Sequence, residues 1–224
     1  MNYARSHHTA SVLPNGKVLV VGGTGIKVKN DSELYDLSTR TWTITDNFNK
    51  KRFQHASVMI NGKVLVTGGS LAPTSAELYD PSSETWTNTG NMNTGRAQHT
   101  ASVLQTGKVL VTGGDERYDG RLTSAELYDP STGLWTTTNS MNTGRYGHTA
   151  SLLKDGRVLV AGGLSAGVTL HSVELYDPST ETWTTIRSTN TKRGRHTVPV
   201  LTNGTLLVAR KDGHSISLKS AEPY

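Results

Sequence analysis

The chain has 224 residues and no cysteine, which excludes disulfides, thiolate catalysis and cysteine-ligated zinc. No apolar run reaches membrane-spanning length and residues 1–30 lack the apolar core of a signal peptide, so we expect no membrane segment and leave the compartment open between the cytoplasm and the outside of the cell. The net charge of +5 arises in residues 187–224, which contain seven basic and two acidic residues. A nucleic-acid-binding protein is expected to carry a more extended basic surface than this local excess.

One unit is repeated about five times along the chain. Its histidine recurs at spacings of 47, 44, 49 and 48 residues, and a Gly-Gly pair and a tryptophan recur in phase with it through the first four units. Markers in phase at such a period indicate a repeat architecture. We expect a single domain over residues 1–224, with repeats at approximately 1–47, 48–91, 92–140, 141–188 and 189–224.

Within each unit the sequence predicts four short strands. The first is His-Thr-Ala-Ser-Val-Leu, with small residues suited to close packing, and the second is Lys-Val-Leu-Val-Thr, apolar on both faces and therefore buried on both. The third is Ser-Ala-Glu-Leu-Tyr, and the fourth surrounds Thr-Trp-Thr. Strand formers dominate these segments, and helix formers rarely follow one another in sequence.

Tight turns separate the strands. Between the first two strands the turns contain a glycine that needs positive φ, at Asn15-Gly16, Asn61-Gly62, Asp155-Gly156 and Asn203-Gly204. Between the last two strands Asp-Pro-Ser predicts a type I turn capped by its aspartate, at Asp80, Asp129 and Asp177. Four antiparallel strands repeated in this way predict an all-β propeller of about five blades. The alternative is an open solenoid, whose repeats usually carry parallel strands or helices.

The motifs resemble those of the kelch family of β-propellers. The resemblance rests on Gly-Gly at the end of the second strand and on Glu-Leu-Tyr-Asp-Pro-Ser-Thr-x-Thr-Trp, and it covers essentially the whole chain. The preceding Arg-x-x-His-Thr-Ala is similar to the variant found in long kelch arrays. The fifth unit departs from the pattern, because Arg210-Lys211 replaces Gly-Gly, Pro223 replaces a leucine and Tyr224 comes before any tryptophan strand. We therefore expect the last blade to be incomplete.

Length variation is confined to one segment of the unit. The segments between the second glycine and the glutamate hold 9, 7, 11 and 10 residues, at 24–32, 70–76, 115–125 and 164–173. In an antiparallel blade these loops emerge at the same face as the link to the next blade. Because the strand that follows the link is innermost in kelch propellers, the resemblance implies that arginines of the links gather at the axial opening. Variable loops on a constant scaffold are where binding surfaces usually form.

We predict ligand-binding residues on this face. One repeated arginine lies three residues before each histidine, and the longest loop and the basic last unit add further polar side chains; the predicted residues are Arg5, Arg52, Arg96, Arg145, Arg193, Arg117, Tyr118, Arg210 and Lys211. A ring of guanidinium groups can bind carboxylates or phosphates through paired hydrogen bonds, and in peptide-binding kelch adaptors some arginines at this position contribute to the pocket.

A second interpretation of the arginines is structural. Each unit holds one arginine and one glutamate, so each arginine can pair with Glu33, Glu77, Glu126, Glu174 or Glu222 and brace the blade. The histidines are interpreted as inter-blade hydrogen-bonding residues, since one per blade rarely converges on a metal. The repeated tyrosines and tryptophans are interpreted as packing residues. We predict no metal and no cofactor.

The leading hypothesis is a non-catalytic binding scaffold for a protein, a peptide or an acidic glycan. Neither specific nucleic acid nor a membrane is expected as a partner, and self-association through the incomplete last blade stays open. One alternative is a structural segment of a longer kelch array without a ligand of its own. Another is an enzyme, but the Tyr–Cys cofactor of galactose oxidase-like kelch proteins needs a cysteine, and no acid–base pair departs from the repeat pattern here.

Overall fold

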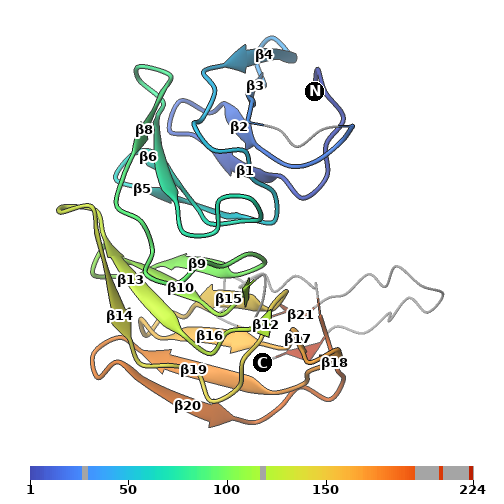
Figure 1. Cartoon of the computed structure of the whole chain (residues 1–224), viewed down its shortest axis with the longest axis vertical. Helices are drawn as coiled ribbons and strands as arrows, with labels where there is room; N and C mark the ends of the chain where they lie inside the picture. Colours follow the sequence, from blue (N-terminus) through green and yellow to red (C-terminus); the bar gives the residue numbers. More distant parts are fainter. Residues whose placement is uncertain (27–29, 117–119, 195–206, 209–221, 224) are drawn as a thin grey trace. The chain divides into compact units, whose positions relative to one another are not determined.

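The computed structural model describes residues 1–26, 30–116, 120–194, 207–208 and 222–223. The described residues contain strands and turns but no helix, and they form four four-stranded antiparallel sheets (Figure 1). In each sheet the first strand pairs with the second, the second with the third and the third with the fourth, as predicted from one repeat. We call these sheets blades one to four.

The strands of the blades follow the repeat closely. Blade one comprises β1 (Thr9–Val12), β2 (Val18–Val21), β3 (Ser32–Asp36) and β4 (Thr41–Thr45). Blade two comprises β5 (Ala56–Ile60), β6 (Lys63–Thr67), β7 (Ala76–Asp80) and β8 (Thr85–Asn88). Blade three comprises β9 (Thr100–Val103), β10 (Val109–Thr112), β13 (Ala125–Asp129) and β14 (Leu134–Thr138). Blade four comprises β15 (Thr149–Leu152), β16 (Val158–Ala161), β19 (Val173–Asp177) and β20 (Thr182–Ile186).

Three smaller sheets complete the described secondary structure. Two of the variable loops form short hairpins, which the sequence did not predict: β11 (Asp115–Glu116) with β12 (Gly120–Arg121), and β17 (Leu164–Ser165) with β18 (Val168–Thr169). In the fifth repeat, β21 (Leu207–Val208) pairs with β22 (Glu222–Pro223). The predicted all-β fold with about five blades and an incomplete last sheet is confirmed. Arg210-Lys211, which replaces Gly-Gly in the fifth unit, lies outside the described residues.

The chain divides into two compact units. The first unit comprises residues 1–98 and 128–136, and the second comprises residues 99–127 and 137–224. Each blade has two ends that follow from its antiparallel order. The loop end carries the variable loop between the second and third strands and the link to the next blade. The turn end carries the two tight turns.

Burial inside the blades follows the strand patterns. The second strands are almost wholly buried, as their two apolar faces require; Val64, Leu65 and Val66 of β6 have no exposed surface. Repeated aromatic pairs close the outer part of the blades, with Tyr79 and Trp86 at 5.1 Å between ring centroids. The hydroxyl groups of Tyr79 and Thr45, which belong to neighbouring blades, are 2.9 Å apart. The tyrosines and tryptophans therefore act as packing residues, as interpreted from the sequence.

The Gly-Gly pairs attach each blade to the next. Both glycines have positive φ in all four pairs, for example 62° at Gly22 and 95° at Gly23. The N–H of the second glycine donates to the main-chain carbonyl of the next repeated arginine, from Gly23 to Arg52 at 3.0 Å and from Gly163 to Arg193 at 2.7 Å. A side chain on Gly22 would meet that same Arg52 carbonyl oxygen at 2.7 Å. The glycines therefore allow one backbone to approach another.

Candidate binding face

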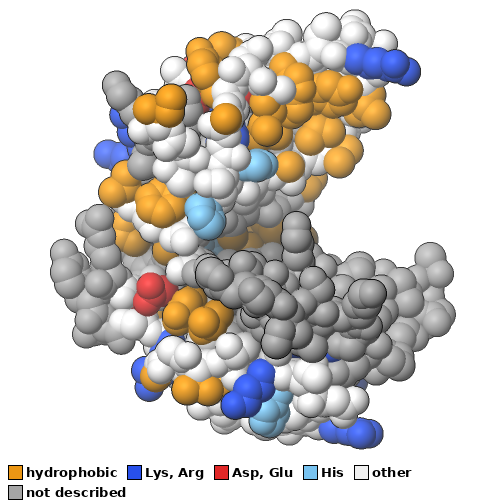
Figure 2. All heavy atoms as spheres, turned by 90° about the vertical axis from the view of Figure 1, so that its right-hand side faces the viewer, with side chains coloured by type: hydrophobic (Ala, Val, Ile, Leu, Met, Phe, Trp, Pro, Cys, Tyr) orange, Lys and Arg blue, Asp and Glu red, His pale blue; other side chains and the backbone are white. Residues whose placement is uncertain are grey.

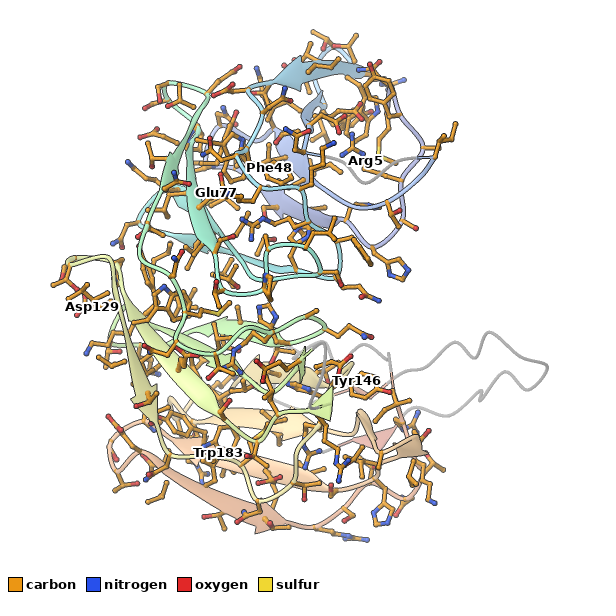
Figure 3. The ribbon with its side chains drawn as sticks, viewed as in Figure 1. Arg5, Phe48, Glu77, Asp129, Tyr146 and Trp183 are labelled. Carbon is orange, nitrogen blue, oxygen red and sulfur yellow. The ribbon has the colours of Figure 1, made fainter. Side chains whose placement is uncertain are left out.

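The repeated arginines lie inside the blades rather than at the surface. Arg5 is 9 % exposed, and the four others have no exposed surface: Arg52, Arg96, Arg145 and Arg193. Figure 3 shows Arg5 directed into blade one, and Glu77 in the interior of blade two. A buried guanidinium needs partners for its charge and its N–H groups.

Glutamates of the same repeat supply the countercharge. The Nη2 group of Arg52 donates to Oε1 of Glu77 at 2.7 Å, and both side chains are almost completely buried. The same pair forms between Arg145 and Glu174 at 2.6 Å, and Arg5 binds both Glu33 and Asp31. These contacts are those of the structural interpretation, in which the arginines brace the blades.

Arg5, Arg52 and Arg145 each also hold both ends of a variable loop. The Nη1 group of Arg52 donates to the carbonyl of Gly68, just before the loop of blade two, at 2.8 Å, and to that of Ser75, at its end, at 3.1 Å. Arg145 makes the matching bonds to Gly162 and Ser172 at 2.8 and 3.0 Å. Because one rigid guanidinium fixes both ends, loops of different length begin and finish at the same place in their blades.

The paired glutamate fixes the link beside the loop. The carboxylate of Glu77 accepts hydrogen bonds from the main-chain N–H groups of Asn49 and Lys50, at 2.7 and 3.2 Å. Glu174 accepts the matching bonds from Asn142 and Thr143, at 2.6 and 3.0 Å. One buried ion pair thus organises the loop and the link at the loop end of each of these blades.

This geometry bears on the predicted ligand-binding residues. A ligand would reach the guanidinium of Arg5, Arg52 or Arg145 only by displacing its glutamate and its loop carbonyls, so we assign these three a positioning role. Ligand contact by the repeated arginines stays a prediction. The other predicted residues lie outside the described part of the chain: Arg117, Tyr118, Arg210 and Lys211.

The two residues between each repeated arginine and histidine differ from that arginine and histidine in their variable composition, backbone conformation and accessibility. In Arg-x-x-His they are Ser6-His7, Phe53-Gln54, Ala97-Gln98 and Tyr146-Gly147 in the described repeats. The second residue is in the left-handed region each time, with φ of 55° at His7 and 56° at Gln54. In the first unit the N–H of Gln54 donates to the His7 carbonyl at 3.1 Å, and that of Gln98 to the Gln54 carbonyl at 2.8 Å. Left-handed non-glycine residues are uncommon and concentrate at functional sites.

These dipeptides adjoin the start of the variable loops. Phe53 forms a β-bridge with Ser70, as Tyr146 (labelled in Figure 3) does with Leu164. His7 and Gln54 are at least partly accessible, although the arginine and histidine positions around the pair are mostly buried. Length variation did not reveal these two residues, because the segment has the same length in every repeat. The signal was their composition, which changes in every repeat between two invariant residues.

Apolar side chains protrude from three of the variable loops. Ile26 is fully exposed, Leu71 is 51 % exposed, and Val168, the first residue of β18, is 53 % exposed. Leu71 has a φ of 76°, a strained value for leucine. Figure 2 shows hydrophobic side chains at the surface of the first unit, in the upper part of the view. Exposed aliphatic residues on these loops suit contact with a protein partner.

The repeated histidines serve the contacts between blades. The Nε2 atom of His55 is 2.9 Å from the Thr9 hydroxyl of the preceding blade, and His148 stands in the same relation to Thr100. The Nδ1 atom of His55 is buried without a hydrogen-bond partner, so a proton there would lack an acceptor. Within the described residues, no three His, Asp or Glu side chains come together as a metal site requires.

Acid should therefore weaken the fold through His55. Burial, with smaller effects from the charges of Arg52 and His8, lowers the pKa of His55 to about 3, below the ordinary 6.5. The native state then binds fewer protons than the unfolded state, so this stability is present above pH 6.5 and is lost as the pH falls toward 3. We expect a loss of about 2 kcal/mol between pH 6.5 and 5 from this residue. Urea unfolding at both pH values, with His55→Gln as control, checks this: an equal loss in the variant would contradict it.

The comparisons with known proteins agree with this architecture. A family model described as Attractin/LZTR1 beta-propeller matches residues 18–221. A solved structure titled "Structure of YjhT" superimposes with a TM-score of 0.73 at 19 % identity, over 92 % of this chain and 72 % of that one. This likeness shows a shared fold. None of the curated proteins matches the sequence significantly. In the part of the chain that the structure describes, no helix has the length and apolar character of a membrane crossing.

Proposed function

Since the chain belongs to the Attractin/LZTR1 β-propeller family, whose members are kelch-type propellers, we propose that it is a non-catalytic interaction scaffold that binds a protein segment at the loop ends of its blades. The observation that carries the proposal is that Arg5, Arg52 and Arg145 each hydrogen-bond to both ends of a variable loop. In blades one, two and four a single guanidinium bonds the carbonyls at both ends of the loop. These hydrogen bonds keep the ends of the loop in place while the loop sequence varies. Binding surfaces are commonly built from variable loops on a constant scaffold.

The chemistry of the loop end points to a partner with apolar and acidic side chains. Ile26 and Leu71 offer exposed aliphatic surface in the first unit. Lys50 and Lys51, on the link beside those loops, are exposed and charged. An acidic glycan would use the lysines but would gain little from the aliphatic residues. A protein segment uses both, and we therefore favour it.

Leu71 is expected to contribute strongly to binding. Peptides selected from a random display library on the wild-type protein provide the probe. The Leu71→Asn variant should bind them about tenfold more weakly, because one well-packed apolar contact is worth about 1–2 kcal/mol at an interface. Asparagine tolerates the left-handed backbone of this position, so the melting temperature should not fall.

Leu37 provides a matched control in the same unit. It is 62 % exposed and lies in the turn between β3 and β4, at the turn end of blade one. The Leu37→Asn variant should bind the selected peptides as the wild-type protein does. Equal losses in the two variants would refute the assignment of the loop end. If no peptides are enriched while an acidic glycan array gives hits that need Lys50 and Lys51, the ligand is a glycan. If neither the peptide library nor the glycan array yields a ligand, the result supports the alternative hypothesis of a structural segment without a ligand of its own.

A further inference from the structure

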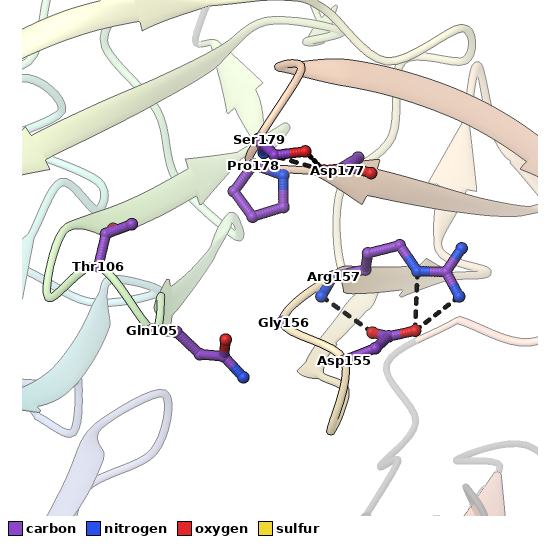
Figure 4. A pocket seen from close by; sticks show the side chains of 8 residues that line it. All are labelled: Gln105, Thr106, Asp155, Gly156, Arg157, Asp177, Pro178 and Ser179. Atoms are coloured by element: carbon purple, nitrogen blue, oxygen red, sulfur yellow. Dashed lines mark hydrogen bonds and ion pairs between the residues drawn. The ribbon is translucent and has the colours of Figure 1, made fainter.

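A groove lies at the turn end of the second unit. It has a volume of about 470 Å³, within the range of small-ligand sites, and three turns of blades three and four form its walls (Figure 4). Its lining residues are Gln105, Thr106, Asp155, Gly156, Arg157, Asp177, Pro178 and Ser179. Variable loops and links have no part in this groove, so it is separate from the proposed protein-binding face.

The carboxylate of Asp177 is held in a fixed orientation in the groove. Its Oδ1 atom accepts hydrogen bonds from the Ser179 hydroxyl at 2.6 Å and from the Ser179 main-chain N–H at 2.9 Å. These bonds, with a smaller effect of the Arg157 charge, hold the pKa of Asp177 below its ordinary value. The carboxylate is therefore charged at neutral pH, and its Oδ2 atom remains for another partner.

Blade two shows what the equivalent oxygen binds. Asp80 is held by Ser82 with the same two bonds, at 2.6 and 2.9 Å. Its Oδ2 atom receives the ammonium group of Lys63 at 3.0 Å. Lys63 follows the hairpin glycine of blade two as Arg157 follows Gly156 in blade four. Blade two thus provides an occupied example of this carboxylate, and the occupant is an alkylammonium group.

In blade four the internal cation is directed elsewhere. The Nε and Nη2 groups of Arg157 donate to Oδ2 of Asp155 at 2.9 and 2.6 Å. Blade two has the neutral Asn61 at the position of Asp155, so Lys63 has no such competitor. Among the described residues no cation forms an ion pair with Asp177, and the three charged side chains of the groove carry a net charge of −1.

We propose that this groove binds a protonated primary amine on a flexible aliphatic chain, with its ammonium group on Oδ2 of Asp177. The ammonium group would take the place that Lys63 takes in blade two. Pro178 and the methylene groups of Gln105 offer apolar surface to the chain of the ligand, and the hydroxyl groups of Thr106 and Ser179 border it. The chemistry fits both a lysine side chain of another protein and a free polyamine.

The test follows main-chain amide NMR signals of Asp177 and Ser179 during titration with N-acetyl-lysine methylamide and, separately, with 1,4-diaminobutane. We expect saturable shifts in the wild-type protein. The Asp177→Asn variant should bind about fivefold more weakly, the loss expected for one partly exposed ion pair. The amine that binds more tightly identifies the source, a protein side chain or a free polyamine.

Two further variants separate this site from a general attraction of cations. Asp155→Asn introduces the residue that blade two has at the equivalent position, so Arg157 should form an ion pair with Asp177 instead of Asp155. Amine binding should then fall although Asp177 is unchanged. Asp80→Asn is the matched control in a blade whose carboxylate is already occupied, and it should leave amine binding unchanged. Absence of saturable shifts in the wild-type protein, or unaltered binding in Asp155→Asn, would overturn the proposal. Asparagine occupies this turn position in blades one and two, so the Asp155→Asn variant should fold normally.

Discussion

Replacing Glu77 with leucine should lower the free energy of unfolding by about 3–5 kcal/mol, the cost of leaving one partner of a buried ion pair without its countercharge. Burial already lowers the pKa of Arg52, and its bonds to Glu77 oppose that effect. The variant would also deprive the main-chain N–H groups of Asn49 and Lys50 of their acceptor. Urea unfolding followed by tryptophan fluorescence measures the change.

Two controls isolate the buried pair. Lys63→Gln breaks the exposed ion pair with Asp80 in the same blade and should cost less than about 1 kcal/mol. The double variant Arg52→Met/Glu77→Leu removes both charges and should be more stable than Glu77→Leu alone, since no unpaired charge remains buried. A Glu77→Leu variant no less stable than Lys63→Gln would show that the pair does not brace the blade.

Gly22→Ala should destabilise the chain by about 3 kcal/mol. Positive φ costs an L-residue about 1–2 kcal/mol, and overpacking adds about 1–3 kcal/mol. The new methyl carbon would lie 2.7 Å from the Arg52 carbonyl oxygen and 2.9 Å from Cε1 of His55, both in the next blade. Gly16→Ala is the control, because Gly16 has a φ of 81° but no heavy atom within 4 Å of the added carbon. Equal denaturation midpoints for the two variants would refute an inter-blade role of Gly22.

The sequence predicted the repeat, the strand order and the turns because these depend on local patterns. Spacing alone could not show that Arg52 pairs with Glu77, because a ligand-binding arginine would also recur once per repeat. The pair became visible only from burial and distance. The left-handed backbone at His7 and Gln54 was also beyond prediction, because those residue types do not require it. Even the contrast between Asn61 and Asp155, visible in the sequence, acquires meaning only once the direction of the neighbouring cation is known.

The hydrogen bonds of Arg52 to both ends of its variable loop have a consequence for protein engineering. Because Arg52 fixes the carbonyls of both Gly68 and Ser75, the distance that an insert must span is set in advance by the scaffold. The entropic penalty for closing a longer loop grows only with the logarithm of its length, at about 0.6 kcal/mol for each doubling. A foreign recognition peptide grafted between Gly68 and Ser75 would therefore have its ends positioned by Arg52, whatever the sequence of the graft.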